Sequence, residues 1–178
     1  MNDLPAPTRR LFIGLFPDPG VQAAIAAHRA SWSWPPGARL TNVARIHMTL
    51  HFLGEVEAGR EALLSRLLCE VPVHRMSLRL GTPQTWRQQI AVLRTQPHAG
   101  LDALHEAIVR QVARAGFAVA NERERWLPHL TIARRTRGAV PPADPAPIVW
   151  RVDHFALVCS HLRPLPHYEA IARYPAPG

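Results

Sequence analysis

Two four-residue strings hold the residues of this chain that are best suited to catalysis. They read His47-Met48-Thr49-Leu50 and His129-Leu130-Thr131-Ile132, so each places one apolar residue after a His and one after a Thr. Successive side chains of a β-strand point to opposite faces, so the His and Thr of each string would share one face while the apolar residues face a core. If two such strands lie side by side, two imidazoles and two hydroxyls converge. These groups are suited to phosphate chemistry without a metal ion.

Two such strings exceed what random placement would give. The chain holds ten His and eight Thr, for which roughly 0.4 His-x-Thr pairs are expected by chance. None of the other His residues is followed by Thr at the second position. A single string would be interpreted most simply as a structural His in a strand. The pair, with apolar residues at matching positions, favours a catalytic site.

The charge balance indicates an anionic partner. The chain of 178 residues carries a net charge of +8, and because it contains no Lys, all 21 basic residues are Arg. Arg forms paired hydrogen bonds with phosphates and stacks on bases, so nucleic acid is favoured over a membrane surface. Composition bias is an alternative source of the Arg excess. A hydrophobic content of 47% fits a globular protein, and we expect it to be a monomer.

The cysteines and the N-terminal segment indicate a cytoplasmic protein. Cys69 and Cys159 lie in apolar segments without CxxC spacing, so we expect both to be reduced, buried thiols. The apolar run 11–16 is too short for a signal peptide and ends at Pro17. No stretch approaches the length of a membrane span. We expect no membrane association, no cofactor and no metal ion.

Hydrophobic periodicity and turn residues divide the chain into strands and helices. Two comparable halves, roughly 1–95 and 96–178, each hold one His-x-Thr strand. We predict a single α+β domain over 1–178 with two similar lobes, whose terminal strands can cross over, and with the two strings facing each other across a cleft. We predict three helices: one that begins at Pro19, one over 61–69 and one over 101–115. The strands are predicted to cover 9–16, 45–52, 75–80, 90–93, 117–120, 126–134, 148–160 and the end of 162–174.

Several segments resemble the 2H phosphoesterase superfamily, and within it the bacterial RNA 2′,3′-cyclic phosphodiesterases, also called 2′-5′ RNA ligases (LigT-like). Paired His-x-Thr strings in this order are specific to the superfamily. The family more often has Asn-Leu ahead of the first His, whereas this chain has Arg45-Ile46, a departure outside the reacting groups. The likeness covers most of the chain and rests on 10–17, 46–54, 128–134, 168–171 and 173–175.

The resemblance implies a bilobal fold with pseudo-twofold symmetry, antiparallel sheets lining a central cleft and helices outside. The implied activity is hydrolysis of a 2′,3′-cyclic phosphate end of RNA to a 2′-phosphomonoester. The resemblance assigns His47 as proton donor and His129 as proton acceptor, a distinction that the sequence alone does not make. Acid–base catalysis by two imidazoles, with the hydroxyls of Thr49 and Thr131 holding phosphate oxygens, agrees with this activity.

Two further residues are candidates for substrate binding. Arg134 stands five residues after His129, where the family carries an Arg near the nucleotide. In an ideal strand it would point away from that His, so a bend or a strand end is required. Phe16 is a candidate for stacking on a base, and its simpler interpretation is a core residue. His51 shares the face of His47 in an ideal strand, but four residues span about 13 Å, too far for one metal ion.

Two other functions remain open. The first is a non-catalytic RNA-binding module that uses Arg and Trp surfaces, although binding alone does not require two titrating groups. The second is a 2H phosphodiesterase that acts on small cyclic nucleotides or on 2′-5′ linkages. Turnover of a cyclic phosphate tests the first alternative, and a comparison of mononucleotides with oligonucleotides tests the second.

Overall fold

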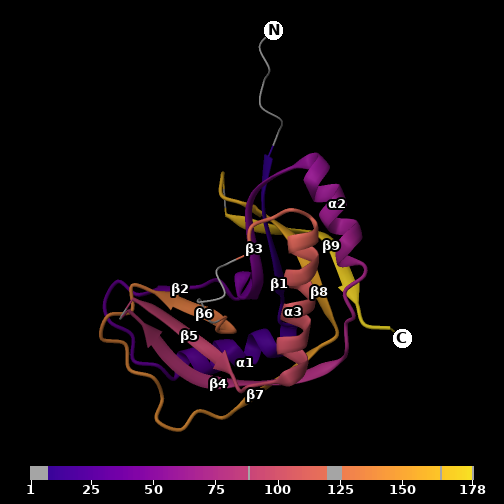
Figure 1. Cartoon of the computed structure of the whole chain (residues 1–178). Coiled ribbons are helices and arrows are strands. Elements are labelled where there is room, and N and C mark those ends of the chain that lie inside the picture. The colour runs from indigo at the N-terminus through magenta and orange to yellow at the C-terminus, as the bar shows by residue number, and fades with distance from the viewer. Residues whose placement is uncertain (1–7, 88, 120–125, 165, 178) are drawn as a thin grey trace.

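One curled antiparallel sheet contains all nine strands of the described chain, and three α-helices pack against it (Figure 1). The computed structural model describes residues 8–87, 89–119, 126–164 and 166–177. None of the described helices has the length and apolar composition needed to cross a membrane. The elements in chain order are β1 (Thr8–Leu15), α1 (Pro19–Ala30), β2 (Arg39–Leu40), the 3-10 helix η1 (Val43–Arg45), β3 (Met48–Glu57), α2 (Ala58–Leu68), β4 (Met76–Trp86), β5 (Ile90–Thr95), α3 (Ala99–Arg114), β6 (His129–Arg134), β7 (Ile148–Val152), β8 (His154–His161) and β9 (His167–Pro175).

The sheet has two arms that meet at the His-x-Thr strings. Its order is β7-β4-β5-β6-β3-β1-β8-β9, and the short β2 pairs with β6. A single residue pair, Met48 with Leu130, joins β3 to β6. The sheet therefore opens there into a first arm (β3, β1, β8 and β9) and a second arm (β6, β5, β4 and β7). In Figure 1, α2 and α3 lie beside the first arm and α1 lies beside the second. The predicted α+β class is confirmed.

Each arm draws strands from both halves of the sequence. In the second arm β4 and β5 precede residue 95 while β6 and β7 follow it, and in the first arm β1 and β3 are joined to β8 and β9. The division near residue 95 thus separates the sequence but not the sheet. Crossing over involves more than the terminal strands. Neither arm can complete its strand pairing from one half of the sequence alone.

Segment 148–160 forms two strands, whereas the sequence predicted one. β7 pairs with β4 at the edge of the second arm, and β8 pairs with β1 in the first arm, with Asp153 between them. Alternate side chains of β7 are exposed, while Phe155 to Cys159 are buried without interruption. An edge strand covered on one face alternates, and a central strand covered on both faces does not. The change of period at Asp153 therefore marks the boundary.

The first motif strand lies further along the chain than predicted. Residues 43–45 form η1, and His47 directly precedes β3, which continues to Glu57. Gly54, which lies beyond the predicted end of the strand at residue 52, adopts a φ of 76° at a register shift against β1, so β3 passes through it as a bulge. The predicted strand at 117–120 is wrong for 117–119, and residue 120 lies outside the described residues.

The apolar residues of both strings form part of the core. Met48, Leu50, Leu130 and Ile132 are at most 2% exposed. Burial of these four side chains fixes the two strings against the core and turns each His and Thr to the other side.

The two cysteines differ in burial. Cys159 is buried in β8, as predicted, but Cys69 is exposed. Cys69 follows the last turn of α2, where Leu64 and Leu68 take the buried face of the helix. The prediction of a buried thiol at Cys69 is therefore wrong.

Candidate active site

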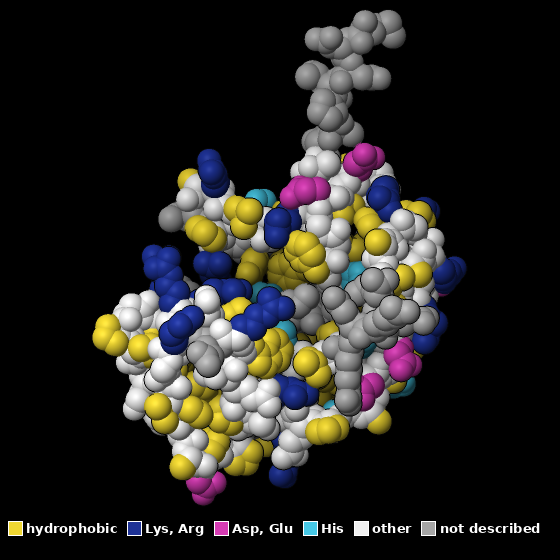
Figure 2. Space-filling view, turned by 60° about the vertical axis from the view of Figure 1, so that its left-hand side comes forward, with side chains coloured by type: hydrophobic (Ala, Val, Ile, Leu, Met, Phe, Trp, Pro, Cys, Tyr) yellow, Lys and Arg dark blue, Asp and Glu magenta, His cyan; other side chains and the backbone are white. Residues whose placement is uncertain are grey.

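The two His-x-Thr strings lie antiparallel at the junction of the arms. Because Met48 is the partner of Leu130, the register places His47 opposite Thr131 and Thr49 opposite His129. These four side chains line one cavity of about 230 Å³, together with Thr41, Arg45, Arg134 and Tyr168. The structure therefore brings together five of the six predicted site residues. Figure 2 shows this face hollowed, with Arg side chains gathered along the rim of the hollow.

Each imidazole is held by the backbone two residues before it. His47 Nδ1 lies 2.9 Å from the carbonyl oxygen of Arg45, and His129 Nδ1 lies 2.8 Å from that of Leu127. A carbonyl oxygen only accepts hydrogen bonds, so each Nδ1 carries a proton. The neutral ring then has an unprotonated Nε2, which is the nitrogen that can exchange a proton with a ligand. The two rings are thus prepared in the same way.

Both site imidazoles have a lowered pKa. Burial is the largest cause of the lowering for each ring. The hydrogen bonds between the Nδ1 atoms and the backbone carbonyls raise the pKa, but by less than burial lowers it. The charges of His129 and Arg45 lower the pKa of His47 further, and Arg94 and Arg134 do the same for His129. None of the described residues that line the cavity is Asp or Glu. The cavity therefore favours an anion, and an anion would restore part of the proton affinity of both rings.

A bulge follows the Thr of each string. In β3, Ile13 pairs with His51 and Gly14 with Thr49, which leaves Leu50 as the extra residue. In β6, Ala91 pairs with Ala133 and Val92 with Thr131, which leaves Ile132 as the extra residue. Each bulge breaks the alternation of faces directly after the motif. The position of the bulge is therefore the same in the two arms, and it decides where the following side chains point.

The bulge in β6 accounts for Arg134. Strict alternation would turn this residue away from His129, but the extra residue at Ile132 reverses the faces and Arg134 lines the cavity. The bend that the sequence interpretation required is present.

The equivalent bulge in β3 turns His51 away from His47. His51 is buried, and its imidazole lies near the backbone of Ala118 and near His105 of α3. The expectation that His51 shares the face of His47 is therefore wrong, because it assumed an unbroken strand.

Aromatic rings surround His47. Phe12 lies 4.8 Å and Tyr168 lies 5.0 Å from His47 between ring centroids, and Phe16 stacks on the same ring at 5.5 Å and 21°. On the other side of the cavity, Trp86 lies 4.3 Å from His129. The structure places Phe16 behind the imidazole, and it is not among the described residues that line the cavity. Its predicted contact with a base stays a prediction.

Sequence reasoning missed Tyr168 and Arg45. Tyr168 reaches the cavity from β9, and the Arg45 guanidinium lies over its ring at 5.5 Å. The resemblance included Tyr168 only as part of a closing segment, because its approach to His47 depends on the pairing of β8 with β9. Arg45 had a local signal: it stands two residues before a motif His, as Leu127 does.

The chain also matches known proteins. A family model described as the 2′-5′ RNA ligase superfamily matches residues 17–162. The chain belongs to this superfamily. It is 32% identical over 134 residues to the RNA 2′,3′-cyclic phosphodiesterase of Escherichia coli (strain K12). This match covers 74% of this chain and 75% of that protein. A protein of the same name from Geobacillus stearothermophilus is 29% identical over 147 residues, and the match spans 46% of its length.

Solved structures that are similar to this chain have the same fold. The crystal structure of E. coli LigT complexed with 3′-AMP matches with a TM-score of 0.85 and 28% identity, covering 97% of this chain and 100% of that one. A crystal structure described as a phosphoesterase gives the same TM-score and identity. The resemblance drawn from the His-x-Thr strings is confirmed, and so is the LigT-like α+β fold.

Proposed function

We propose that this chain hydrolyses 2′,3′-cyclic phosphate ends of RNA to 2′-phosphomonoesters by metal-free acid–base catalysis. The observation that carries the proposal is the meeting of both His-x-Thr strings in one cavity, with each imidazole held through Nδ1. The names of the relatives in E. coli and G. stearothermophilus support the choice of substrate.

The proposed step is an in-line displacement at phosphorus. A water molecule loses a proton to Nε2 of His129 and its oxygen bonds to the phosphorus, while the bond from phosphorus to the ribose 3′ oxygen breaks. Nε2 of His47 gives a proton to that departing oxygen. The hydroxyls of Thr49 and Thr131 donate hydrogen bonds to the non-bridging oxygens as negative charge grows on them. Arg134 adds a positive charge to the lining of the cavity, near His129.

The lowered pKa of both rings shapes this mechanism. A base must be neutral, and burial favours the neutral ring at His129. The acid must be protonated, and burial acts against this at His47. The phosphate anion of a bound substrate offsets that effect, because an opposite charge nearby favours the protonated ring. Binding of the substrate is therefore expected to favour the protonated form of His47, which is the form that acts as the acid.

Product analysis tests the proposal. The full chain is incubated with an oligonucleotide that ends in a 2′,3′-cyclic phosphate, with and without EDTA, and the products are separated by chromatography. A 2′-phosphate formed equally fast in both incubations is expected. A 3′-phosphate would assign a different breaking bond, and activity that EDTA removes and a divalent ion restores would overturn the metal-free mechanism.

A smaller substrate is a second candidate. The cavity volume of about 230 Å³ is below the roughly 300–1,000 Å³ of sites that enclose a drug-sized ligand, so it fits a phosphate with its ribose. This size is compatible with a small cyclic nucleotide, or a 2′-5′ linkage, as well as with an RNA end. The values of kcat/KM for a mononucleotide and for a matched oligonucleotide separate these substrates. Absence of turnover with every substrate would favour the non-catalytic RNA-binding module.

A further inference from the structure

A second group of metal-binding side chains lies outside the catalytic cavity, on strands β8 and β9. The Cys159 sulfur, a ring nitrogen of His161 and a carboxylate oxygen of Glu169 all lie within 4.8 Å of one another. Cys159 and His161 are two residues apart and share one face of β8. Glu169 is the direct partner of Cys159 on β9. The neighbouring side chains Ala156 and Val158 point to the opposite face, where they pack with Phe12 on the side of the catalytic cavity.

We propose that Cys159, His161 and Glu169 form a binding site for a zinc-like divalent cation that clamps β8 to β9. Zinc accepts thiolate, imidazole and carboxylate ligands, and three such ligands leave a fourth position for water. Bonds of about 2.0–2.3 Å to a tetrahedral zinc place ligand atoms roughly 3.3–3.8 Å apart. His161 Nε2 lies 2.9 Å from Glu169 Oε2, and the widest separation is at most 4.8 Å. Small side-chain rotations therefore suffice.

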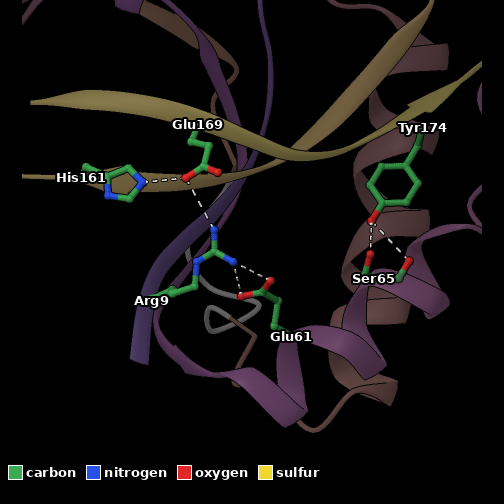
Figure 3. Close-up of polar contacts among 6 residues, drawn as sticks. All are labelled: Arg9, Glu61, Ser65, His161, Glu169 and Tyr174. Carbon is green, nitrogen blue, oxygen red and sulfur yellow. Dashed lines mark hydrogen bonds and ion pairs between the residues drawn. The ribbon is translucent and has the colours of Figure 1, made fainter. Parts of the chain in front are cut away.

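The strands provide a firm frame for this site. Cys159 is 3% exposed and belongs to the main core. The stacked rings of His161 and His167, 4.4 Å apart, hold the imidazole beside β9. Tyr174 ties β9 to α2 through its hydroxyl, which lies 3.1 Å from Ser65 Oγ (Figure 3). The three ligand groups are thus carried by paired strands that are anchored to the rest of the protein.

The side chain of Arg9 is a built-in competitor for the cation. Its guanidinium lies close enough to Cys159 to interact with the thiol. It lies 3.6 Å from Glu169 and bonds Glu61 at 3.0 Å (Figure 3). Arg9 can keep Glu61 when a metal ion takes Glu169. A divalent cation then balances one thiolate and one carboxylate, and Glu61 balances Arg9. Removal of the Arg9 charge should strengthen metal binding, an effect that a merely structural role of this residue would not produce.

Titration of the metal-free full chain with Zn²⁺ or Co²⁺ tests the site. We expect one equivalent of Zn²⁺ to bind and to raise Tm, and one equivalent of Co²⁺ to give a thiolate charge-transfer band. Cys159→Ser should remove the band, and His161→Ala should weaken Zn²⁺ binding by more than the roughly 10- to 100-fold typical of outer-shell changes. Arg9→Gln should tighten binding several-fold. Hydrolysis of cyclic phosphates should stay unchanged by zinc, because the site lies on the opposite face of the sheet.

Matched controls come from the same chain. Cys69→Ser removes the exposed thiol, and His154→Ala removes another His of β8 that bonds a carboxylate, Asp153, without a neighbouring Cys. Both controls should bind like the unaltered chain. The proposal is overturned if the chain binds no Zn²⁺, or if the cobalt band follows Cys69 instead of Cys159. If Cys159→Ser does not fold, His161→Ala and Glu169→Gln, which change half-buried and exposed side chains, still decide the outcome.

Discussion

At the scale of single residues, the site depends on two imidazoles held in the same way. Hydrogen bonds from Nδ1 to the carbonyls of Arg45 and Leu127 leave Nε2 of each ring for proton transfer. Each carbonyl belongs to the residue two positions before its His, so the geometry is local and accompanies each motif. The two rings are therefore prepared in the same way for proton transfer.

Removal of either imidazole should abolish most of the hydrolysis. His47→Ala and His129→Ala are each expected to lower kcat/KM for a cyclic phosphate by about 10²–10⁴-fold, because each removes one proton transfer. Circular dichroism should show an unchanged fold, since both rings line a cavity. His154→Ala, which alters a His outside the cavity, serves as the control. A variant at 47 or 129 with near-normal turnover would remove that residue from the mechanism.

The pH dependence of kcat/KM should be displaced to the acid side. The pKa of both site rings is lowered from 6.5, so the free enzyme loses the proton of its acid below that pH. We expect a bell-shaped profile with an optimum below 6.5 and a steep fall above about pH 7. The alkaline limb of kcat should lie at higher pH, because the bound phosphate raises the pKa of the acid. A kcat/KM that still rises above about pH 7 would contradict this assignment.

Arg134 should contribute mainly to substrate binding. It lines the cavity and raises the positive charge beside His129. Arg134→Ala is expected to raise KM by roughly 10- to 100-fold, the equivalent of one charged hydrogen bond. Lys at 134 should restore only part of the affinity, since it lacks the planar pair of donors. Arg137→Ala, an exposed Arg of the following turn, is the control. Equal effects at 134 and 137 would indicate general charge attraction only.

At the scale of elements, the bulges after the two motifs carry the geometry that alternation alone does not predict. The identities of His47, Thr49, His129 and Thr131 were readable from spacing, because side chains two apart in a strand share a face. The direction of Arg134 and the turning away of His51 depend on an extra residue in each strand. A bulge is fixed by pairing with β1 or β5, which are distant in sequence, so no local pattern announces it.

Gly14 provides a test of the pairing that holds the first motif. It is the partner of Thr49, and a Cβ at this position would lie 3.0 Å from the carbonyl oxygen of Met48 and 3.2 Å from the Phe12 ring, which packs on His47. Gly14→Ala should therefore push β1 away from β3, cost about 1–3 kcal/mol of unfolding free energy and lower kcat. Thermal unfolding and turnover measure the two effects.

The matched control for this change is Gly59→Ala in α2. Apart from its chain neighbours and the backbone of its own helix, no heavy atom lies within 4 Å of the position of a Cβ at Gly59, and alanine favours a helix. This variant is expected to keep full activity and to be as stable as the unaltered chain or more so. If Gly14→Ala behaved in the same way, close packing of β1 would not be needed to hold the first motif.

At the scale of the whole molecule, the two arms show where sequence interpretation reached its limit. The alternation of helices and strands and the two motif halves were visible in the sequence. The order of strands was not, because β7 and β8 run on from each other through Asp153 yet belong to different arms. Tyr168 could not be assigned to the cavity for the same reason. Long-range pairing, which no local periodicity encodes, brings it beside His47.

The net charge of +8 belongs to the same scale, and its function can be tested through salt. Arg side chains gather around the hollow face in Figure 2. Phe52 is exposed beside its strand partner Phe12, and the guanidinium of Arg10 lies 4.9 Å from the centroid of the Phe52 ring. If these groups contact phosphates beyond the reacting one, each contact on a single strand lowers log affinity by about 0.7 per tenfold rise in salt.

We therefore expect salt to raise KM strongly for oligonucleotides and weakly for mononucleotides, with kcat nearly constant because proton transfer inside the cavity is less screened. Steady-state kinetics over a range of salt concentrations, with both substrates at one pH, measure this difference. The same salt response for both substrates would assign the Arg excess to composition, and the small-nucleotide substrate would then be preferred over RNA.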